Sequence, residues 1–209
     1  WTGSQVACVA GDTPQALKNA IQSRINFYRA MAGVPADITL TPEYNSGAQQ
    51  AALMMSAQGA LSHSPASSFR CYTALGAQTA GSSNLALGAS GPDVIDLYVQ
   101  DYGTNNAAVG HRRWLLYPQT KFMGTGDTPG AGGYRAANAL RVFDNNMWNP
   151  RPQARDGFVA WPPPGYTPFP TVFARWSFSY PDASFAGASV TMRSNGATWP
   201  IRIEAITNG

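Results

Sequence analysis

Gly110-His111-Arg112-Arg113-Trp114-Leu115-Leu116-Tyr117-Pro118 joins a titratable imidazole, two fixed cations and a large aromatic ring near the middle of the chain. Proline cannot continue a helix and shifts the residue before it toward extended geometry, so we expect a short helix that stops before Pro118. His111 then lies at the N-terminal end of that helix, where free N–H groups disfavour imidazolium and favour a neutral ring able to accept a proton or bind a metal. The alternative is that His111 only hydrogen-bonds a neighbouring loop.

The composition indicates a folded chain with a real core. The chain has 209 residues, of which 44% are hydrophobic, so its length fits one domain with an extension or two small domains. No apolar run approaches the roughly 20 residues that cross a bilayer, and the start at Trp1 suggests a processed or excised form. A net charge of +3 is too small and too scattered to indicate a nucleic-acid-binding protein.

Cys8 and Cys71 are the only two cysteines, and neither belongs to a Cys-x-x-Cys pair. We expect a disulfide between them, which would close a long loop and stabilise the fold by about 4 kcal/mol on the chain-entropy model. Such a bond persists in an oxidising compartment, so it predicts an exported protein. Two buried free thiols are the alternative.

Three longer helices are predicted from apolar spacing and from proline and glycine positions. The first runs from Thr13-Pro14 to Gly33, and the second starts at Thr41-Pro42 and ends before Pro65. The second is rich in alanine, which would allow close approach to a neighbour. The third runs from Gly91-Pro92-Asp93 to Gly103. Between the last two helices, residues 64–90 show no sustained period and are predicted to be a long loop pinned by the disulfide.

Strands are predicted on both sides of Tyr134. The expected segments are 38–40 as an edge strand, 122–126, 134–143 and 158–161. Residues 161–166 are proline-rich and predict a stiff linker or a packed brace. The chain is therefore divided into a first domain, 1–162, with an N-terminal arm, and a β-strand extension, 163–209, that could belong to a second domain.

Three further strands are expected in the extension, forming one antiparallel unit with a turn at Asn195-Gly196. Apolar residues alternate around Val172, Trp176 and Phe178, and again on both sides of the turn. A lone unit of this size needs its apolar face covered, so we expect Val172, Trp176 and Phe178 to face inward.

Four short stretches occur in a fixed order within residues 14–145. They are Arg24-Ile25-Asn26-Phe27-Tyr28-Arg29 followed by Gly33, Leu61-Ser62-His63, Ser83-Asn84-Leu85-Ala86, and the His111 stretch followed by Met123-Gly124-Thr125-Gly126. Together they resemble the CAP superfamily (SCP/TAPS), which includes cysteine-rich secretory, antigen 5 and pathogenesis-related 1 proteins, and most of all its bacterial branch. The resemblance implies an α+β fold, a three-layer α-β-α sandwich, here with a C-terminal antiparallel β extension.

The resemblance also implies a cleft with two histidines and two acidic residues that often binds a divalent metal. Carried over residue by residue, the histidines are His63 and His111, and the acidic positions fall on Ser83 and Asp101. One carboxylate is therefore missing. His63, His111 and Asp101 are expected to hold zinc only weakly, and no cofactor is required. Tyr98 stands where the family has tryptophan.

Two alternatives for these residues stay open. Ser83 could be a nucleophile activated by either histidine with Asp101 as the orienting group, but no Gly-x-Ser-x-Gly elbow surrounds it. Asp101 could equally be a surface or capping residue. For Arg112 and Arg113 we expect one arginine in an ion pair within the fold and one exposed.

The leading interpretation is an exported bacterial CAP-like binding or interaction module, secreted or at the cell surface, whose ligand outside the cell is a protein, glycan or lipid. With half of the acidic pair absent, we expect low or no enzymatic activity. The rival interpretations are a metal-assisted or Ser/His-based hydrolase using His63, His111, Asp101 and Ser83, and a structural component of an extracellular matrix or surface assembly. We expect no nucleic-acid partner and no transmembrane segment.

Overall fold

The helices begin and end where the sequence provides start and stop signals. In the computed structural model, which describes residues 1–206, α1 spans Gln15–Met31 and α2 spans Pro42–Gln58. The Thr41 side chain caps α2 by accepting a hydrogen bond from the backbone of Tyr44, and the helix ends at Gly59 with φ of 72°. The third predicted helix is α4, Asp93–Gln100, and the His111 stretch forms α5, Gly110–Leu115.

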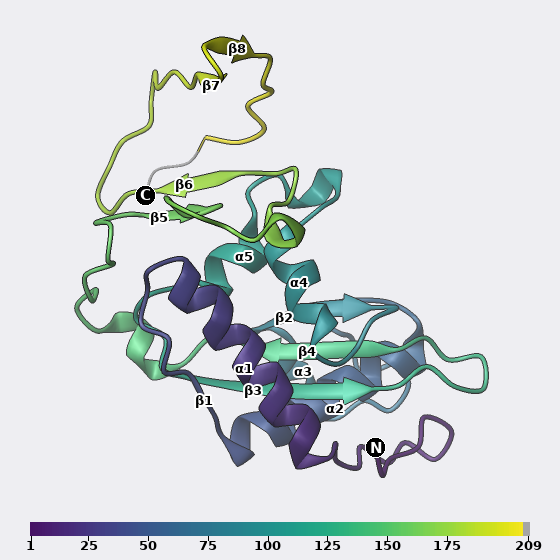
Figure 1. The fold of residues 1–209 in the computed structure, drawn as a ribbon. Coiled ribbons are helices and arrows are strands. Elements are labelled where there is room, and N and C mark those ends of the chain that lie inside the picture. Colours follow the sequence, from purple (N-terminus) through teal and green to yellow (C-terminus); the bar gives the residue numbers. More distant parts are fainter. Residues whose placement is uncertain (207–209) are drawn as a thin grey trace.

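A four-stranded sheet lies at the centre of the fold, in the order β1-β3-β4-β2 (Figure 1). These strands are Thr39–Leu40, Phe122–Thr128, Ala137–Arg141 and Ser83–Leu87, respectively. β1 pairs with β3 in parallel, and the other two pairings are antiparallel. The strands predicted at 38–40, 122–126 and 134–143 are thus confirmed.

Helix α2 packs unusually close to β3, as its alanine content predicted. A Cβ atom added at Gly126 would lie 2.1 Å from the backbone of Ala48, and one added at Gly124 would lie 2.3 Å from the backbone of Tyr44. Any side chain at these two glycines would therefore push the helix off the sheet. The glycine-interrupted pattern of β3 is thus a consequence of this contact.

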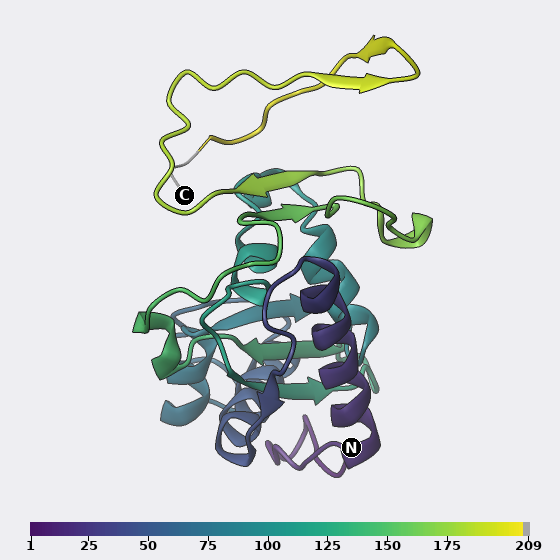
Figure 2. The same cartoon turned by 60° about the vertical axis from the view of Figure 1, so that its left-hand side comes forward.

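Helices cover both faces of the sheet, which confirms the three-layer α-β-α arrangement (Figures 1 and 2). On one face, side chains of α1, α4 and α5 form a cluster around Ile21, Ile95 and Leu115 that also takes in Leu140 of β4. On the other face, alanines and methionines of α2 pack on alternate residues of β4 and on Leu85 of β2. The sheet is therefore buried on both faces.

The region 64–90 is more ordered than its composition predicted. It contains helix α3, Ala74–Ala80, and strand β2 of the central sheet. The side chain of Thr73 caps α3 by accepting from Gly76, whose own position would bring a Cβ within 2.6 Å of the Met54 sulfur. Small residues give α3 its close packing but no apolar period, and this is why the pattern predicted a loop.

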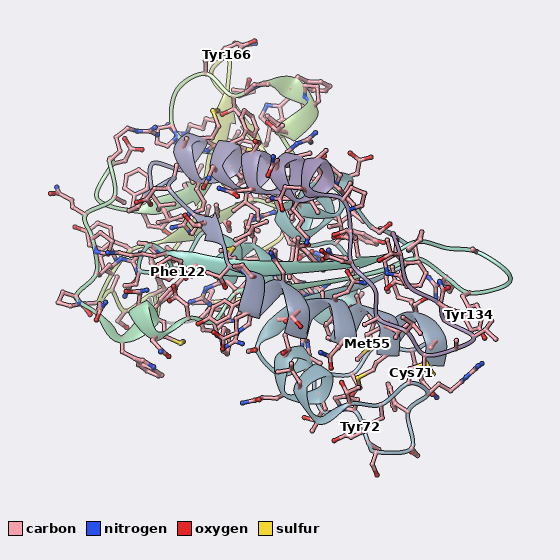
Figure 3. The ribbon with its side chains drawn as sticks, turned by 90° about the horizontal axis from the view of Figure 1, so that it is seen from below. Met55, Cys71, Tyr72, Phe122, Tyr134 and Tyr166 are labelled. Carbon is pink, nitrogen blue, oxygen red and sulfur yellow. A yellow bond between two sulfur atoms is a disulfide. The ribbon has the colours of Figure 1, made fainter. Side chains whose placement is uncertain are left out.

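The predicted disulfide between Cys8 and Cys71 is present, across a sequence separation of 63 residues. It ties the N-terminal arm to the segment before α3, and Figure 3 shows Cys71 at the same end of the molecule as Tyr134. The arm is also held by Gln5, whose side-chain amide donates to the Pro129 carbonyl over 2.7 Å. Both contacts fix the arm beside the loop between β3 and β4.

The C-terminal extension does not form one three-stranded unit, so that prediction is wrong. β5 (Val159–Trp161) pairs with β6 (Ser177–Ser179), across the boundary predicted at 162/163. β7 (Met192–Ser194) and β8 (Ala197–Trp199) form a separate hairpin around Asn195-Gly196. Figure 2 shows this hairpin standing away from the β5–β6 pair, which itself lies over α4 and α5.

The prediction that Val172, Trp176 and Phe178 face inward is wrong for Trp176 and Phe178, which are 55% and 54% exposed, whereas Val172 is half-buried. Arg175 and Ser177 instead point toward the domain and hydrogen-bond it. The alternation of residues 175–178 between two faces was predicted correctly, but the sequence pattern did not show which face packs against the domain. The covered face is polar because it meets backbone carbonyls and a buried guanidinium.

One buried carboxylate makes the stability of this core pH-dependent. Asp127 is 2% exposed and accepts hydrogen bonds from the Gly91 backbone, the Asn138 amide and the Thr125 hydroxyl. Burial raises its pKa, with these hydrogen bonds acting in the opposite direction. The folded state therefore binds a proton at a higher pH than the unfolded chain. Its stabilising contribution is complete below the usual aspartate pKa of about 4 and is lost as the pH rises through the raised pKa.

Asp127→Asn should remove that dependence, because asparagine keeps an acceptor oxygen and cannot ionise. We expect the free energy of unfolding of the variant, measured by urea unfolding from about pH 4 to 8, to fall less with rising pH than that of the parent. Asp182→Asn is the control, because Asp182 is exposed and has φ of 58°, which asparagine tolerates. Parallel curves for the parent and Asp127→Asn would contradict the assignment.

Candidate functional site

Asp101 ends α4 with a buried carboxylate. It adopts the left-handed conformation, with φ of 51°, and is only 1% exposed. One carboxylate oxygen lies 2.8 Å from Nδ1 of His111, and the other accepts the backbone N–H of Arg112 over 3.2 Å. The turn between α4 and α5 thus brings Asp101 directly against the start of α5.

Both the ring and the backbone of His111 are held by neighbouring residues. The ring stacks on Tyr98, with centroids 5.5 Å apart and planes at 26°. The backbone carbonyl of His111 accepts from the Asn84 side-chain amide over 3.0 Å. The Tyr98 hydroxyl donates to Oδ1 of Asn138 over 2.8 Å, and burial raises the pKa of Tyr98, helped by the charge of Asp127.

This environment fixes the tautomer of His111. The Asp101 carboxylate can only accept, so in the neutral ring Nδ1 carries the hydrogen and Nε2 has the lone pair. The side chain of His111 is 24% exposed, so solvent reaches the ring. Within residues 1–206, no hydrogen bond involves Nε2 of His111. Asp101 therefore orients the imidazole and leaves the other nitrogen available.

His63 lies beyond the end of α2, as predicted, and is exposed. Its Nδ1 lies 2.9 Å from the carbonyl oxygen of Ala80 at the end of α3. A carbonyl can only accept, so Nδ1 again carries the hydrogen and Nε2 keeps its lone pair. The two histidines thus have the same tautomer, fixed by different acceptors.

Both histidines contact one short segment of chain. The ring of His63 donates to the Ala80 carbonyl, and the backbone carbonyl of His111 accepts from the side-chain amide of Asn84, four residues further on. Four residues of extended chain span at most about 14 Å, which is the upper limit for the separation of these two backbone positions. The turn from α3 into β2 is the shared support.

Ser83 lies in this segment but is not arranged as a nucleophile. Its residue is 6% exposed, and its hydroxyl donates to the Thr79 carbonyl over 2.7 Å. A serine nucleophile needs its base within hydrogen-bond reach. In the part of the chain that the structure describes, Ser83 makes no hydrogen bond to His63 or His111.

Arg112 is buried and Arg113 is exposed, as expected, but Arg112 forms no ion pair among residues 1–206. Its guanidinium is buried and donates to the carbonyls of Val99, Gln100 and Arg175 and to the Ser177 hydroxyl, at 2.5, 3.2, 2.8 and 2.8 Å. Burial lowers the pKa of Arg112 to about 10, against the opposing effect of Asp101. The contacts with carbonyls replace the expected carboxylate partner.

No group of three or more His, Cys, Asp or Glu side chains suited to a metal ion is found among residues 1–206. Glu204, one of the two glutamates, pairs with Arg175 and Arg202 instead. The Nε2 atoms of His63 and His111 remain as the candidate metal ligands of this region. Zinc accepts such imidazole ligands.

Sequence reasoning missed three residues of the site. Asn84 was inside a recognised stretch, but its amide contact with His111 had no signal of its own. Asn138 looked like an ordinary strand residue. Arg175, which donates to carbonyls of the loop after α4, was assigned to the extension. All three act across elements distant in sequence.

The cysteine-rich secretory protein family model, CAP, matches residues 22–148, more than half of the chain. The chain belongs to the CAP family. The match covers all four strands of the central sheet and both histidines. No curated protein matches this CAP domain significantly. No helix among its described residues is long and apolar enough to span a membrane.

Proposed function

We propose that this CAP domain is an exported binding module whose His63 and His111 bind one divalent metal ion, zinc, weakly through Nε2. The observation that carries the proposal is the matching state of the two rings. Each has Nδ1 committed to an oxygen acceptor and Nε2 without a hydrogen bond within the described residues. Metal-binding histidines almost always have this arrangement, because the outer acceptor fixes the tautomer and raises the basicity of the ligand.

The residues of the chain have distinct roles in this proposal. Asp101 orients His111, the ring of Tyr98 stacks on the His111 imidazole, and the Ala80 carbonyl orients His63. Bound zinc would supply a positive charge able to attract an anionic or carbonyl group of a ligand. The disulfide supports an exported protein, because such bonds persist in oxidising compartments.

A metal-assisted hydrolase is the second candidate, and the Asp101–His111 hydrogen bond favours it. A buried carboxylate on Nδ1 is the arrangement that makes an imidazole a general base. Among the described residues no second carboxylate joins these side chains in a cluster, and the Ser83 hydroxyl donates to the Thr79 carbonyl. We therefore expect binding to dominate over hydrolysis.

Calorimetric titration of the parent with zinc tests the proposal. We expect one ion per chain with a dissociation constant of about 1 µM or weaker, because two protein ligands supply about half of the roughly 10–16 kcal/mol of four-ligand sites. Lowering the pH should weaken binding, since a protonated imidazole cannot be a ligand. Absence of zinc binding at millimolar concentration, or binding that is equally strong at low pH, would contradict it.

A further inference from the structure

Arg175 of the C-terminal extension reaches the loop that carries Asp101. Its guanidinium donates to the backbone carbonyls of Asp101, Gly103 and Asn106, the last two at 3.0 and 3.2 Å. These carbonyls lie about 70 residues earlier in the chain, with sequence separations of 69 to 74. A planar guanidinium suits such a set because its donors point in several fixed directions.

Asp101 is in an unfavourable backbone conformation, which contacts from outside the loop must stabilise. It has φ of 51°, in the left-handed region. A left-handed non-glycine residue costs about 1–2 kcal/mol and persists only where its surroundings fix it. Arg175 also forms an ion pair with Glu204, whose carboxylate lies 2.5 Å from Nε. Glu204 also bonds Arg202, and both arginines lower its pKa.

The guanidinium of Arg112 contacts the segment of chain that carries Arg175. Arg112 donates to the Arg175 carbonyl and to the Ser177 hydroxyl, and its own backbone N–H holds Asp101. Asp101 is thus hydrogen-bonded at its backbone carbonyl by Arg175 and at its carboxylate by the His111 ring and the Arg112 backbone N–H of α5. The β5–β6 pair that carries these contacts lies over α4 and α5 in both ribbon views (Figures 1 and 2).

We propose that Arg175 is a positioning residue for His111: by fixing the loop 101–106, it keeps the Asp101 carboxylate on Nδ1 and so keeps Nε2 of His111 free for a ligand. The C-terminal extension is then a part of the site and not an appendage. The consequence for zinc rests on the proposed function, whereas the consequence for the tautomer does not.

The tautomer is directly measurable because the chain has only two histidines. Long-range 1H–15N correlation spectra at about pH 8.5, where an ordinary imidazole is neutral, report which ring nitrogen carries the hydrogen. His63→Ala assigns the two signals. In the parent, both rings should show the Nδ1–H form. In Arg175→Ala, His111 should shift toward a mixture with the Nε2–H form while His63 does not change.

Further variants separate positioning from general damage. Arg175→Lys keeps the charge but cannot bridge three carbonyls, so it should give a smaller shift of the His111 signal. Asp101→Ala, which removes the acceptor, gives the reference for complete loss. Arg193→Ala, an exposed arginine of the same extension, should change neither ring. If Arg175→Ala unfolds, as an altered melting temperature and a shifted His63 signal would show, Arg175→Lys decides the question.

An unchanged His111 tautomer in a folded Arg175→Ala or Arg175→Lys variant would overturn the proposal. Zinc titration of the same variants supplies the second measurement, with an expected loss of about tenfold in Arg175→Ala, the lower end of what outer-shell residues contribute. If the parent binds no zinc but the tautomer shifts, the positioning role stands and the metal proposal fails. If zinc binds and the tautomer does not move, the reverse holds.

Discussion

Replacing Arg29 by alanine is expected to lower the free energy of unfolding by about 3–5 kcal/mol. The guanidinium is fully buried between α1 and the chain that follows α5. It donates to four backbone carbonyls, those of Pro35, Leu115, Tyr117 and Thr120, at 2.7, 2.9, 2.9 and 3.2 Å. Each buried carbonyl that loses its partner costs about 1–3 kcal/mol, part of which water entering the cavity would recover.

The charge on Arg29 is retained at neutral pH. Burial lowers its pKa to about 10, while Asp37 and Asp144 act in the opposite direction. Arg24→Ala on the same helix is the matched control. The Arg24 side chain is 38% exposed and its ion pair with Asp96 is open to solvent, so its loss should cost less than about 1 kcal/mol. Urea unfolding of both variants measures the difference. Equal losses would show that Arg29 does not have the structural role assigned to it.

His63→Ala and His111→Ala are each expected to weaken zinc binding by at least about 100-fold. Each removes one of the two protein ligands, which leaves a single imidazole with little affinity of its own. Because one ion needs both rings, the double variant should bind scarcely less than either single one, so the losses should be far from additive.

Arg70→Ala serves as a control for zinc bound elsewhere at the surface. Arg70 is exposed, precedes α3 in the chain and contacts Tyr134, and it makes neither of the two contacts that hold the histidines. It should leave zinc binding unchanged. Calorimetry on the four variants is sufficient. Tight binding that survives both single substitutions would place the metal away from His63 and His111.

The fold could be predicted largely from the sequence because local signals and packing agree in most elements. Asn26 and Arg29 of the first recognised stretch have structural roles. The Asn26 side chain pairs with both backbone groups of Ile38, at 3.1 and 3.0 Å, and Arg29 closes the end of α5. Asn26 and Arg29 therefore join α1 to neighbouring segments of the fold, whereas the histidines lie near the ends of helices.

What could not be predicted depends on contacts between distant segments. No local pattern shows that Arg175 fills the turn at Asp101, or that β5 and β6 pair across the proline-rich segment 162–168. The same limit applies to α3, whose small residues fit against α2 without an apolar stripe. The two histidines were predicted as a pair, but the acceptors that fix their tautomers, Asp101 and the Ala80 carbonyl, differ in kind.

The most direct test of the central claim is an anomalous difference map, collected at the zinc edge from crystals of the parent soaked with zinc. We expect one peak within about 2.0–2.1 Å of Nε2 of both His63 and His111, the usual zinc–nitrogen distance, with the Asp101 carboxylate still hydrogen-bonded to Nδ1 of His111. A map with no peak at these rings, or with a peak on only one of them, would contradict it.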